Sequence, residues 1–157
     1  MKGAVGAMPQ SLSCVLVHLI FSTKNRDPVL NPEIRAELHP YLAGVLHEDG
    51  CPAVQVGGVE DHVHLLLGLS RTRTVAQVVE NVKTSSSKWI KTKGTAFADF
   101  YWQAGYGAFS VSQSNAGAVV QYIQNQVEHH RKVTFQEEYR RFLKRYQIAY
   151  DENYVWD

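Results

Sequence analysis

One short stretch, EDHVHLLL at residues 60–67, constrains the fold of this chain more than any other. Its apolar and β-branched content predicts a strand, and the period of two in a strand puts His62 and His64 on one face. The opposite face carries Val63, Leu65 and Leu67, which we expect to be buried. Two imidazoles that project side by side from a rigid backbone suit a divalent metal ion. Histidines that are only hydrogen-bonded on a polar sheet face would show the same pattern. Residues elsewhere in the chain are therefore needed to distinguish a metal site from such a pair.

The composition is that of a folded, globular protein. Of the 157 residues, 45% are hydrophobic, and the net charge is +1, which argues against a disordered chain. We expect a single domain over residues 12–157, preceded by a flexible N-terminus at residues 1–11. His18 interrupts the apolar run near the N-terminus and no cleavage site follows, so we expect no signal peptide; no stretch is long enough to span a membrane.

Cysteine usage points to a reducing compartment. Cys14 and Cys51 fit neither a disulfide framework nor a zinc knuckle. Cys14 lies in an apolar run and is predicted to be a core residue. We therefore expect a cytoplasmic protein.

Apolar periodicity divides the chain into alternating strands and helices. Strands are predicted at residues 14–21, 53–56, 62–67 and 108–111. Helices are predicted at residues 32–49, 75–90, 115–130 and 135–146. The order β-α-β-β-α-β-α is the split βαβ, ferredoxin-like pattern. The predicted fold class is therefore α+β, with an antiparallel four-stranded sheet, helices on one face and extra C-terminal helices.

The predicted helix at residues 115–130 adds a second constraint. Its expected buried stripe consists of Ala116, Val119, Val120, Ile123 and Val127. On the flank of that stripe stand Tyr122, Gln126 and His129, so packing would hold Tyr122 while its hydroxyl meets a polar site. An ordinary boundary tyrosine of an amphipathic helix would show the same pattern.

Strand and helix together indicate phosphodiester chemistry. A divalent ion held by His62, His64 and Gln126 would polarise a phosphodiester that Tyr122 attacks. A phenol, with a pKa of about 10, needs such help to act as a nucleophile. The resulting phosphotyrosine would keep the bond energy, so rejoining needs no ATP, and the chain has no Gly-x-x-x-x-Gly-Lys-Ser/Thr loop. Asp61 is placed either to orient an imidazole or only to cap a turn.

Basic residues concentrate between residues 71 and 93, where six lysines and arginines accompany one acidic residue. Such a stretch attracts phosphates, although a solvated helix face has the same composition. The candidate phosphate contacts are Arg71, Arg73, Lys83 and Lys88, together with Arg26 from an earlier polar loop.

Several of these stretches resemble a known family. DHVHLL at residues 61–66 resembles the HUH motif (His, hydrophobic, His), and YIQNQ at residues 122–126 resembles the helix of the single-tyrosine HUH transposases. These small transposases move bacterial and archaeal insertion sequences as single-stranded DNA. Further likeness lies in HLIFSTK at 18–24, WQAGYGAFSV at 102–111 and YVWD at 154–157, so it covers nearly the whole chain.

The resemblance implies a metal-dependent DNA transposase that cleaves and rejoins single-stranded DNA at hairpin-bearing element ends. Tyr122 would form a 5′-phosphotyrosine, and His62, His64 and Gln126 would bind Mg²⁺ or Mn²⁺. The resemblance also implies a homodimer, in which the tyrosine helix of one chain can complete the site of the other.

Three other interpretations remain open. One is a repeat-associated tyrosine transposase with a host role, and another is a rolling-circle initiator or relaxase. Relaxases carry the tyrosine ahead of the HUH motif, whereas Tyr122 follows it, and initiators commonly need further domains. The third is a non-catalytic nucleic-acid-binding or metal-binding domain, which a cleavage assay on single-stranded DNA would distinguish.

Overall fold

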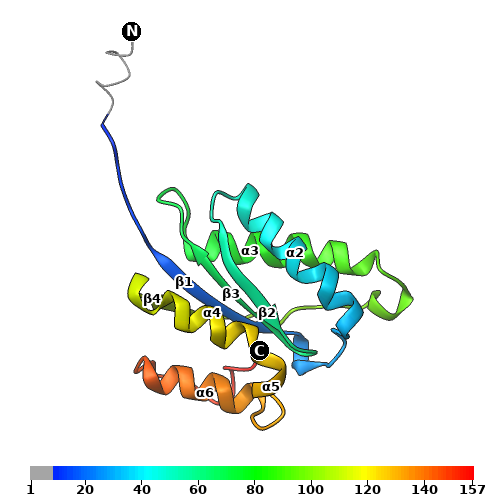
Figure 1. The fold of residues 1–157 in the computed structure, drawn as a ribbon. Coiled ribbons are helices and arrows are strands. Elements are labelled where there is room, and N and C mark those ends of the chain that lie inside the picture. The colour runs from blue at the N-terminus through cyan, green and yellow to red at the C-terminus, as the bar shows by residue number, and fades with distance from the viewer. Residues whose placement is uncertain (1–8) are drawn as a thin grey trace.

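The computed structural model describes residues 9–157, in which strands β1–β4 form one antiparallel sheet (Figure 1). The strands are β1 (Leu16–Ser22), β2 (Ala53–Gly58), β3 (His62–Gly68) and β4 (Gly107–Val111). Their spatial order is β2-β3-β1-β4, so β3 and β1 are central. This arrangement confirms the predicted α+β fold of the split βαβ, ferredoxin-like type.

Helices α2 (Pro32–Glu48) and α3 (Val75–Lys91) cover one face of the sheet (Figure 1). The side chain of Asn31 caps α2, and Thr74 caps α3 through a capping box with Gln77. These caps satisfy backbone N–H groups that the first turn of a helix leaves without intrahelical partners.

The apolar face of β3 lies at the centre of the main core beneath these two helices. Val63, Leu65 and Leu67 are at most 1% exposed, as the alternation in the sequence predicted. They form one apolar cluster with buried residues of β1, α2 and α3. The aromatic loop after α3 folds back and adds Phe97, Phe100 and Trp102 to this cluster.

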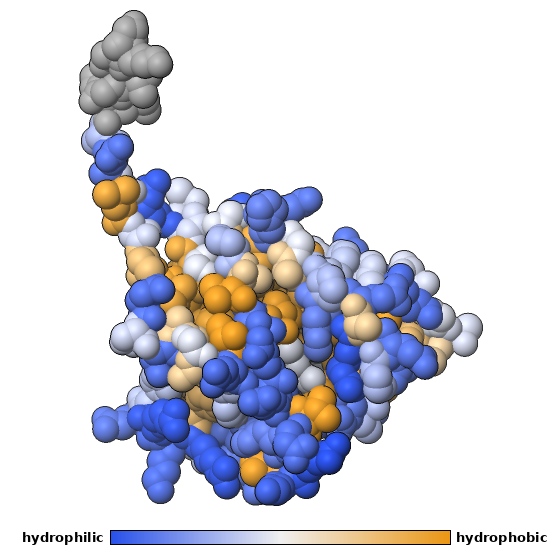
Figure 2. Space-filling view, viewed as in Figure 1, coloured by the Kyte–Doolittle hydropathy of each residue, from blue (hydrophilic) through white to orange (hydrophobic). Residues whose placement is uncertain are grey.

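Helices α4 (Ala116–Gln124), α5 (Gln126–His129) and α6 (Phe135–Arg145) lie on the opposite face of the sheet (Figure 1). A smaller apolar cluster there joins Ile20 of β1 and Phe109 of β4 to α6. The surface over α6 is mainly hydrophilic, while apolar side chains gather near α4 and β2 (Figure 2). Short 3-10 turns occur at Lys24–Arg26, Thr95–Phe97 and Gln113–Asn115.

Three local predictions were wrong or incomplete. The helix expected at residues 115–130 is interrupted at Asn125, whose backbone (φ −95°, ψ 19°) leaves the helical region. The interruption turns Val127 away from the expected buried stripe, and its side chain is 51% exposed. Cys14 is exposed because β1 begins only at Leu16, so Cys14 is not a core residue.

The two ends of the described chain differ in how they pack. Of the expected flexible N-terminus, residues 1–8 lie outside the described residues, and residues 9–15 precede β1 without helix or strand. At the other end, Trp156 and Val155 pack against the smaller apolar cluster. Within residues 9–157, no helix combines the length and apolarity needed to cross a membrane.

Candidate metal and tyrosine site

The two histidines of β3 project from the sheet towards α4–α6 and are fully buried. Each ring is fixed through its Nδ1 atom. The Nδ1 of His62 lies 2.7 Å from Asp61 Oδ1, and the Nδ1 of His64 lies 2.8 Å from Nε2 of His18 on β1. These bonds turn both Nε2 atoms towards the C-terminal helices, an orientation that metal-ligating histidines commonly have.

Gln126 begins α5 directly after the interruption at Asn125 and is 1% exposed. Its Oε1 lies 3.1 Å from His62 Nε2, and its Nε2 donates to Glu138 Oε2 at 3.2 Å. The structure therefore brings Gln126 to the histidine pair, as the sequence indicated. One turn earlier, Tyr122 is half-buried and donates its hydroxyl hydrogen to Glu138 Oε2.

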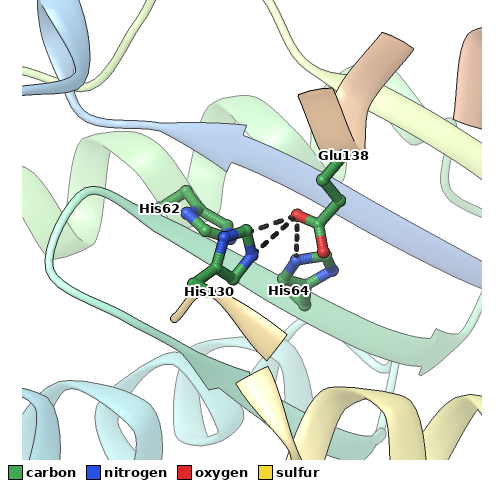
Figure 3. A group of neighbouring side chains, drawn as sticks. All are labelled: His62, His64, His130 and Glu138. Carbon is green, nitrogen blue, oxygen red and sulfur yellow. Dashed lines mark hydrogen bonds and ion pairs between the residues drawn. The ribbon is translucent and has the colours of Figure 1, made fainter. Parts of the chain in front are cut away.

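Glu138 of α6 is the residue at which these groups meet, and Figure 3 shows it beside His62, His64 and His130. Its Oε1 faces three ring nitrogens: it lies 3.3 Å from His62 Nε2, 3.1 Å from His64 Nε2 and 3.2 Å from His130 Nε2. Its Oε2 faces the Tyr122 hydroxyl and the Gln126 amide, and lies 3.3 Å from His129 Nε2. One carboxylate thus connects the histidines to the tyrosine.

The charges in this cluster are strongly coupled. Burial alone would raise the pKa of Glu138, but the neighbouring imidazoles of His64, His130 and His62 hold that pKa well below its usual range. Burial alone would lower the pKa of His62, but its hydrogen bonds to Asp61 and Glu138 raise that pKa to about 9. An ionised carboxylate beside a protonated imidazole balances the buried charge of the cluster.

The Tyr122 phenol is held in its neutral form. Burial and the negative charge of Glu138 raise the pKa of Tyr122 above its ordinary value. Reaction at this oxygen therefore needs a nearby positive charge or a proton acceptor. A neighbouring cation that neutralises Glu138 would supply this positive charge.

A cavity of about 330 Å³ opens beside Tyr122. His18, Glu138 and the basic residues Arg141 and Arg145 of α6 contribute to its lining. A second hollow that Tyr122 also lines is bordered in part by Lys132 and again by Arg141. Positive side chains beside the hydroxyl suit a phosphate-bearing ligand.

The sequence-predicted phosphate contacts lie elsewhere. Arg71 and Lys88 are exposed, and Arg73 pairs with Asp49 at 2.8 Å. These residues, like Lys83, belong to α3 or to the turn before it, on the face of the sheet away from Tyr122. The Lys83 ammonium donates to the carbonyls of Gln103, Ala104 and Gly105, at 2.7, 3.2 and 2.7 Å, and so holds the loop before β4. Arg26 lies over the Trp156 ring.

Sequence reasoning missed the contributions of His18, His130, Glu138, Arg141 and Arg145, and it placed His129 beside Tyr122 and Gln126 without giving it a role. Two of them left a signal in the sequence. Glu138 interrupts the apolar stripe of its own helix, next to Tyr139 and one turn from Phe135 and Phe142, where a buried carboxylate needs partners. His18 interrupts the apolar run of β1 on the face that β3 continues with His64.

The donor set fits a divalent metal ion. Ligand atoms of His62, His64, His130 and Glu138 all lie within 4.8 Å of one another. His130 Nε2 is buried and makes no hydrogen bond to any described residue. A buried ring nitrogen directed at a carboxylate and two further imidazoles is the arrangement that a cation would satisfy.

The chain matches known transposases over most of its length. Residues 11–126 match the family described as "Transposase IS200 like". The ISDra2 transposase TnpA of Deinococcus radiodurans is 25% identical over 114 residues, which cover 69% of this chain and 81% of that protein.

Solved structures agree with this match. A crystal structure from Deinococcus radiodurans R1, described as that of a transposase, superposes with a TM-score of 0.60 at 27% identity. It covers 76% of this chain and 98% of its own. A REP-associated tyrosine transposase bound to a REP hairpin has the same fold, with a TM-score of 0.58 at 12% identity, over 78% of this chain and 72% of its own. This chain belongs to the IS200-like transposase family.

Proposed function

We propose that this transposase cleaves and rejoins single-stranded DNA through a covalent 5′-phosphotyrosine at Tyr122, with His62, His64 and Gln126 as ligands of a divalent metal ion. One observation carries the proposal. The Tyr122 hydroxyl shares a single carboxylate, Glu138, with both histidines of β3. In an IS200-like transposase, a tyrosine that close to a divalent-metal donor set has the parts that phosphodiester cleavage needs.

The covalent step balances as an exchange of one phosphate ester for another. The Tyr122 oxygen forms a bond to phosphorus, the bond from phosphorus to the 3′-oxygen breaks, the phenol proton passes to a neighbouring acceptor, and the departing 3′-oxygen takes up one proton from solvent. Glu138 Oε2 and His129 Nε2 both lie near that proton, the latter 3.3 Å from the Tyr122 oxygen. The released strand carries a 3′-hydroxyl, and its attack on a phosphotyrosine reverses the reaction without ATP. A bound metal ion would supply positive charge to the phosphate.

We propose hairpins at the ends of a mobile element as the substrate. The structural relative bound to a REP hairpin supports this choice, because its fold is the fold of this chain. Arg141 and Arg145 would contact the phosphates on either side of the cleaved bond, since both line the cavity beside Tyr122. Magnesium and manganese are both candidate ions.

We also propose that the protein is a homodimer whose sites are each complete within one chain. In the structure, Tyr122 and the β3 histidines of the same chain meet at Glu138. Ring packing between Tyr122 and Phe142 of α6, with centroids 5.8 Å apart, holds the tyrosine helix there. An exchange of that helix between two chains would have to break these contacts.

The test is a covalent-adduct assay with labelled single-stranded DNA that carries a hairpin. Tyr122→Phe removes only the hydroxyl, so we expect folding and DNA binding to persist while adducts fall to background. Tyr106→Phe is the matched control, because Tyr106 is 37% exposed in the loop before β4 and should leave adducts unchanged. Adducts that persist in Tyr122→Phe would assign the nucleophile to another residue.

A further inference from the structure

We propose that His130 and Glu138 are metal ligands, so that the C-terminal segment completes the ion site begun by the histidines of β3. This inference rests on the proposed function, because it concerns the same metal. It adds two donors from residues 127–157, which lie beyond the stretch that matches the transposase family. It also narrows the choice of metal.

Three imidazole rings at this site are oriented alike. His130 Nδ1 lies 2.6 Å from the carbonyl oxygen of Val133, to which it donates. His62 and His64 have their Nδ1 atoms engaged in the same way, by Asp61 and His18. All three rings therefore present Nε2 to one common space. A hydrogen bond that fixes Nδ1 and directs Nε2 is the usual support of a metal-bound histidine.

The spacing of the donor atoms also suits one ion. Glu138 Oε1 lies 3.1–3.3 Å from the three Nε2 atoms. Two ligands of one tetrahedral ion, each bound at about 2.0–2.1 Å, lie about 3.3 Å apart. Each imidazole is thus already separated from the carboxylate oxygen as two co-ligands of one ion would be, and all four donor atoms lie within 4.8 Å of one another.

The surroundings of the His130 ring also favour a bound ion. Its side chain is 7% exposed, and Nε2 lies 3.2 Å from Glu138 Oε1. The direction is nevertheless wrong for a hydrogen bond, and the atom has no such partner among the described residues. A buried nitrogen lone pair without a donor costs free energy that an ion would recover.

The types of ligand atom at this site favour some metal ions over others. Three imidazoles and one carboxylate, with the amide oxygen of Gln126 3.1 Å from His62 Nε2, form a nitrogen-rich site. Magnesium prefers oxygen ligands and retained water, whereas manganese and zinc accept imidazole. We therefore expect manganese to bind more tightly than magnesium, with zinc as a further occupant.

The competing explanation is that Glu138 only pairs with a protonated His62. In that case the carboxylate neutralises the imidazole and competes with a metal for the same space. Removal of its charge would then leave metal affinity unchanged or increase it. The ligand proposal requires the opposite change, so one measurement separates the two explanations.

The experiment is calorimetric titration of the full chain with Mn²⁺ alone, after removal of bound metal. Glu138→Gln keeps the size of the side chain and His130→Ala removes the ring, and we expect each to weaken Mn²⁺ binding at least about tenfold. The matched controls, Glu137→Gln on the same helix and His47→Ala on α2, replace exposed residues and should bind as the parent does. Parent-like or tighter binding in either site variant would overturn the proposal.

Visible absorption of the Co²⁺-loaded protein is a second measurement, for the case in which a variant folds too poorly for calorimetry. The Co²⁺-loaded parent protein should show visible absorption bands that change in shape when a ligand is replaced. The conservative Glu138→Asp variant keeps a carboxylate, so it should retain more of the parent spectrum than Glu138→Gln. Identical spectra for the parent and Glu138→Gln would overturn the proposal. The adduct assay on Tyr122 is independent of these titrations, so a failure of the proposed function would be seen separately.

Discussion

The two faces of the sheet are built from the same strands and differ in what they bury. On the face under α2 and α3, β3 contributes Val63, Leu65 and Leu67 to an apolar core. On the face under α4–α6, the same strand contributes His62 and His64 to a buried polar cluster. The period of two therefore assigns alternate residues of one strand to stability and to chemistry. Substitutions on the polar face should therefore leave stability largely unchanged, and substitutions on the apolar face should leave adduct formation by the folded protein largely unchanged.

The largest expected effect comes from removal of a histidine on the polar face. His64→Ala should reduce covalent adducts to background, while hairpin affinity stays within about twofold, because phosphate contacts elsewhere supply the binding. Gel analysis of adducts and a binding titration measure the two properties. Adducts that persist in the parent protein with excess chelator would contradict a metal-dependent step.

A mixture of His64→Ala and Tyr122→Phe chains extends this experiment to the assembly. Sites complete within one chain leave one lesion in each site of a heterodimer, so the mixture should stay inactive. Sites shared between chains would place both lesions in one site and leave the other intact. Recovered cleavage, with heterodimer formation verified separately, would therefore show exchange of the tyrosine helix.

The apolar face should show the reverse pattern. Leu65→Ala removes a fully buried side chain, so it should lower the free energy of unfolding by about 2–5 kcal/mol. Adduct formation per folded molecule should remain close to that of the parent at low temperature. Urea denaturation measures the first quantity, and adduct yield corrected for the folded fraction measures the second. A loss of adducts much larger than the loss of folded protein would show that the two faces are coupled.

At Gly57, β2 lies in close contact with the tyrosine helix α4. A Cβ atom added there would meet Ile123 of α4 at 2.8 Å, both at Cγ2 and at the backbone carbonyl oxygen. Gly57→Ala should therefore push α4 away from the sheet, lower the unfolding free energy by about 1–3 kcal/mol and reduce adduct yield. Gly44→Ala in α2 is the control, because a Cβ at that position meets no atom within 4 Å. Normal adduct yield in Gly57→Ala would mean that α4 accommodates the methyl group.

The same comparison explains which predictions from sequence succeeded. The buried residues of β3 and the stripes of α2 and α3 follow from periodicity, because each apolar residue there needs only a neighbouring layer. Motif and helical spacing predicted that Tyr122 and Gln126 lie near the β3 histidines, and the structure brings these side chains together around Glu138. These features depend on local geometry, which a sequence pattern records.

The rest of the polar face depends on tertiary geometry. The interruption at Asn125 directs Gln126 inward and Val127 outward, and no glycine or proline marks that position. Glu138 reaches the histidines only because α6 folds back over the sheet, a contact between residues 74 positions apart for His64. Periodicity shows that a carboxylate lies on an apolar stripe, but it does not show which buried groups on another element satisfy it.

The smallest expected effect concerns DNA binding, and it compares basic residues on the two faces. Arg141 and Arg145 line the cavity beside Tyr122, whereas Arg71 and Lys88 are exposed on the α3 side. Replacing both arginines of α6 with Gln should flatten the dependence of log affinity on log salt by about two units, one for each lost phosphate contact. The matched double variant of Arg71 and Lys88 should leave that slope unchanged if DNA binds only on the polar face. A flatter slope in the second variant would mean that the bound strand continues around the edge of the sheet to α3.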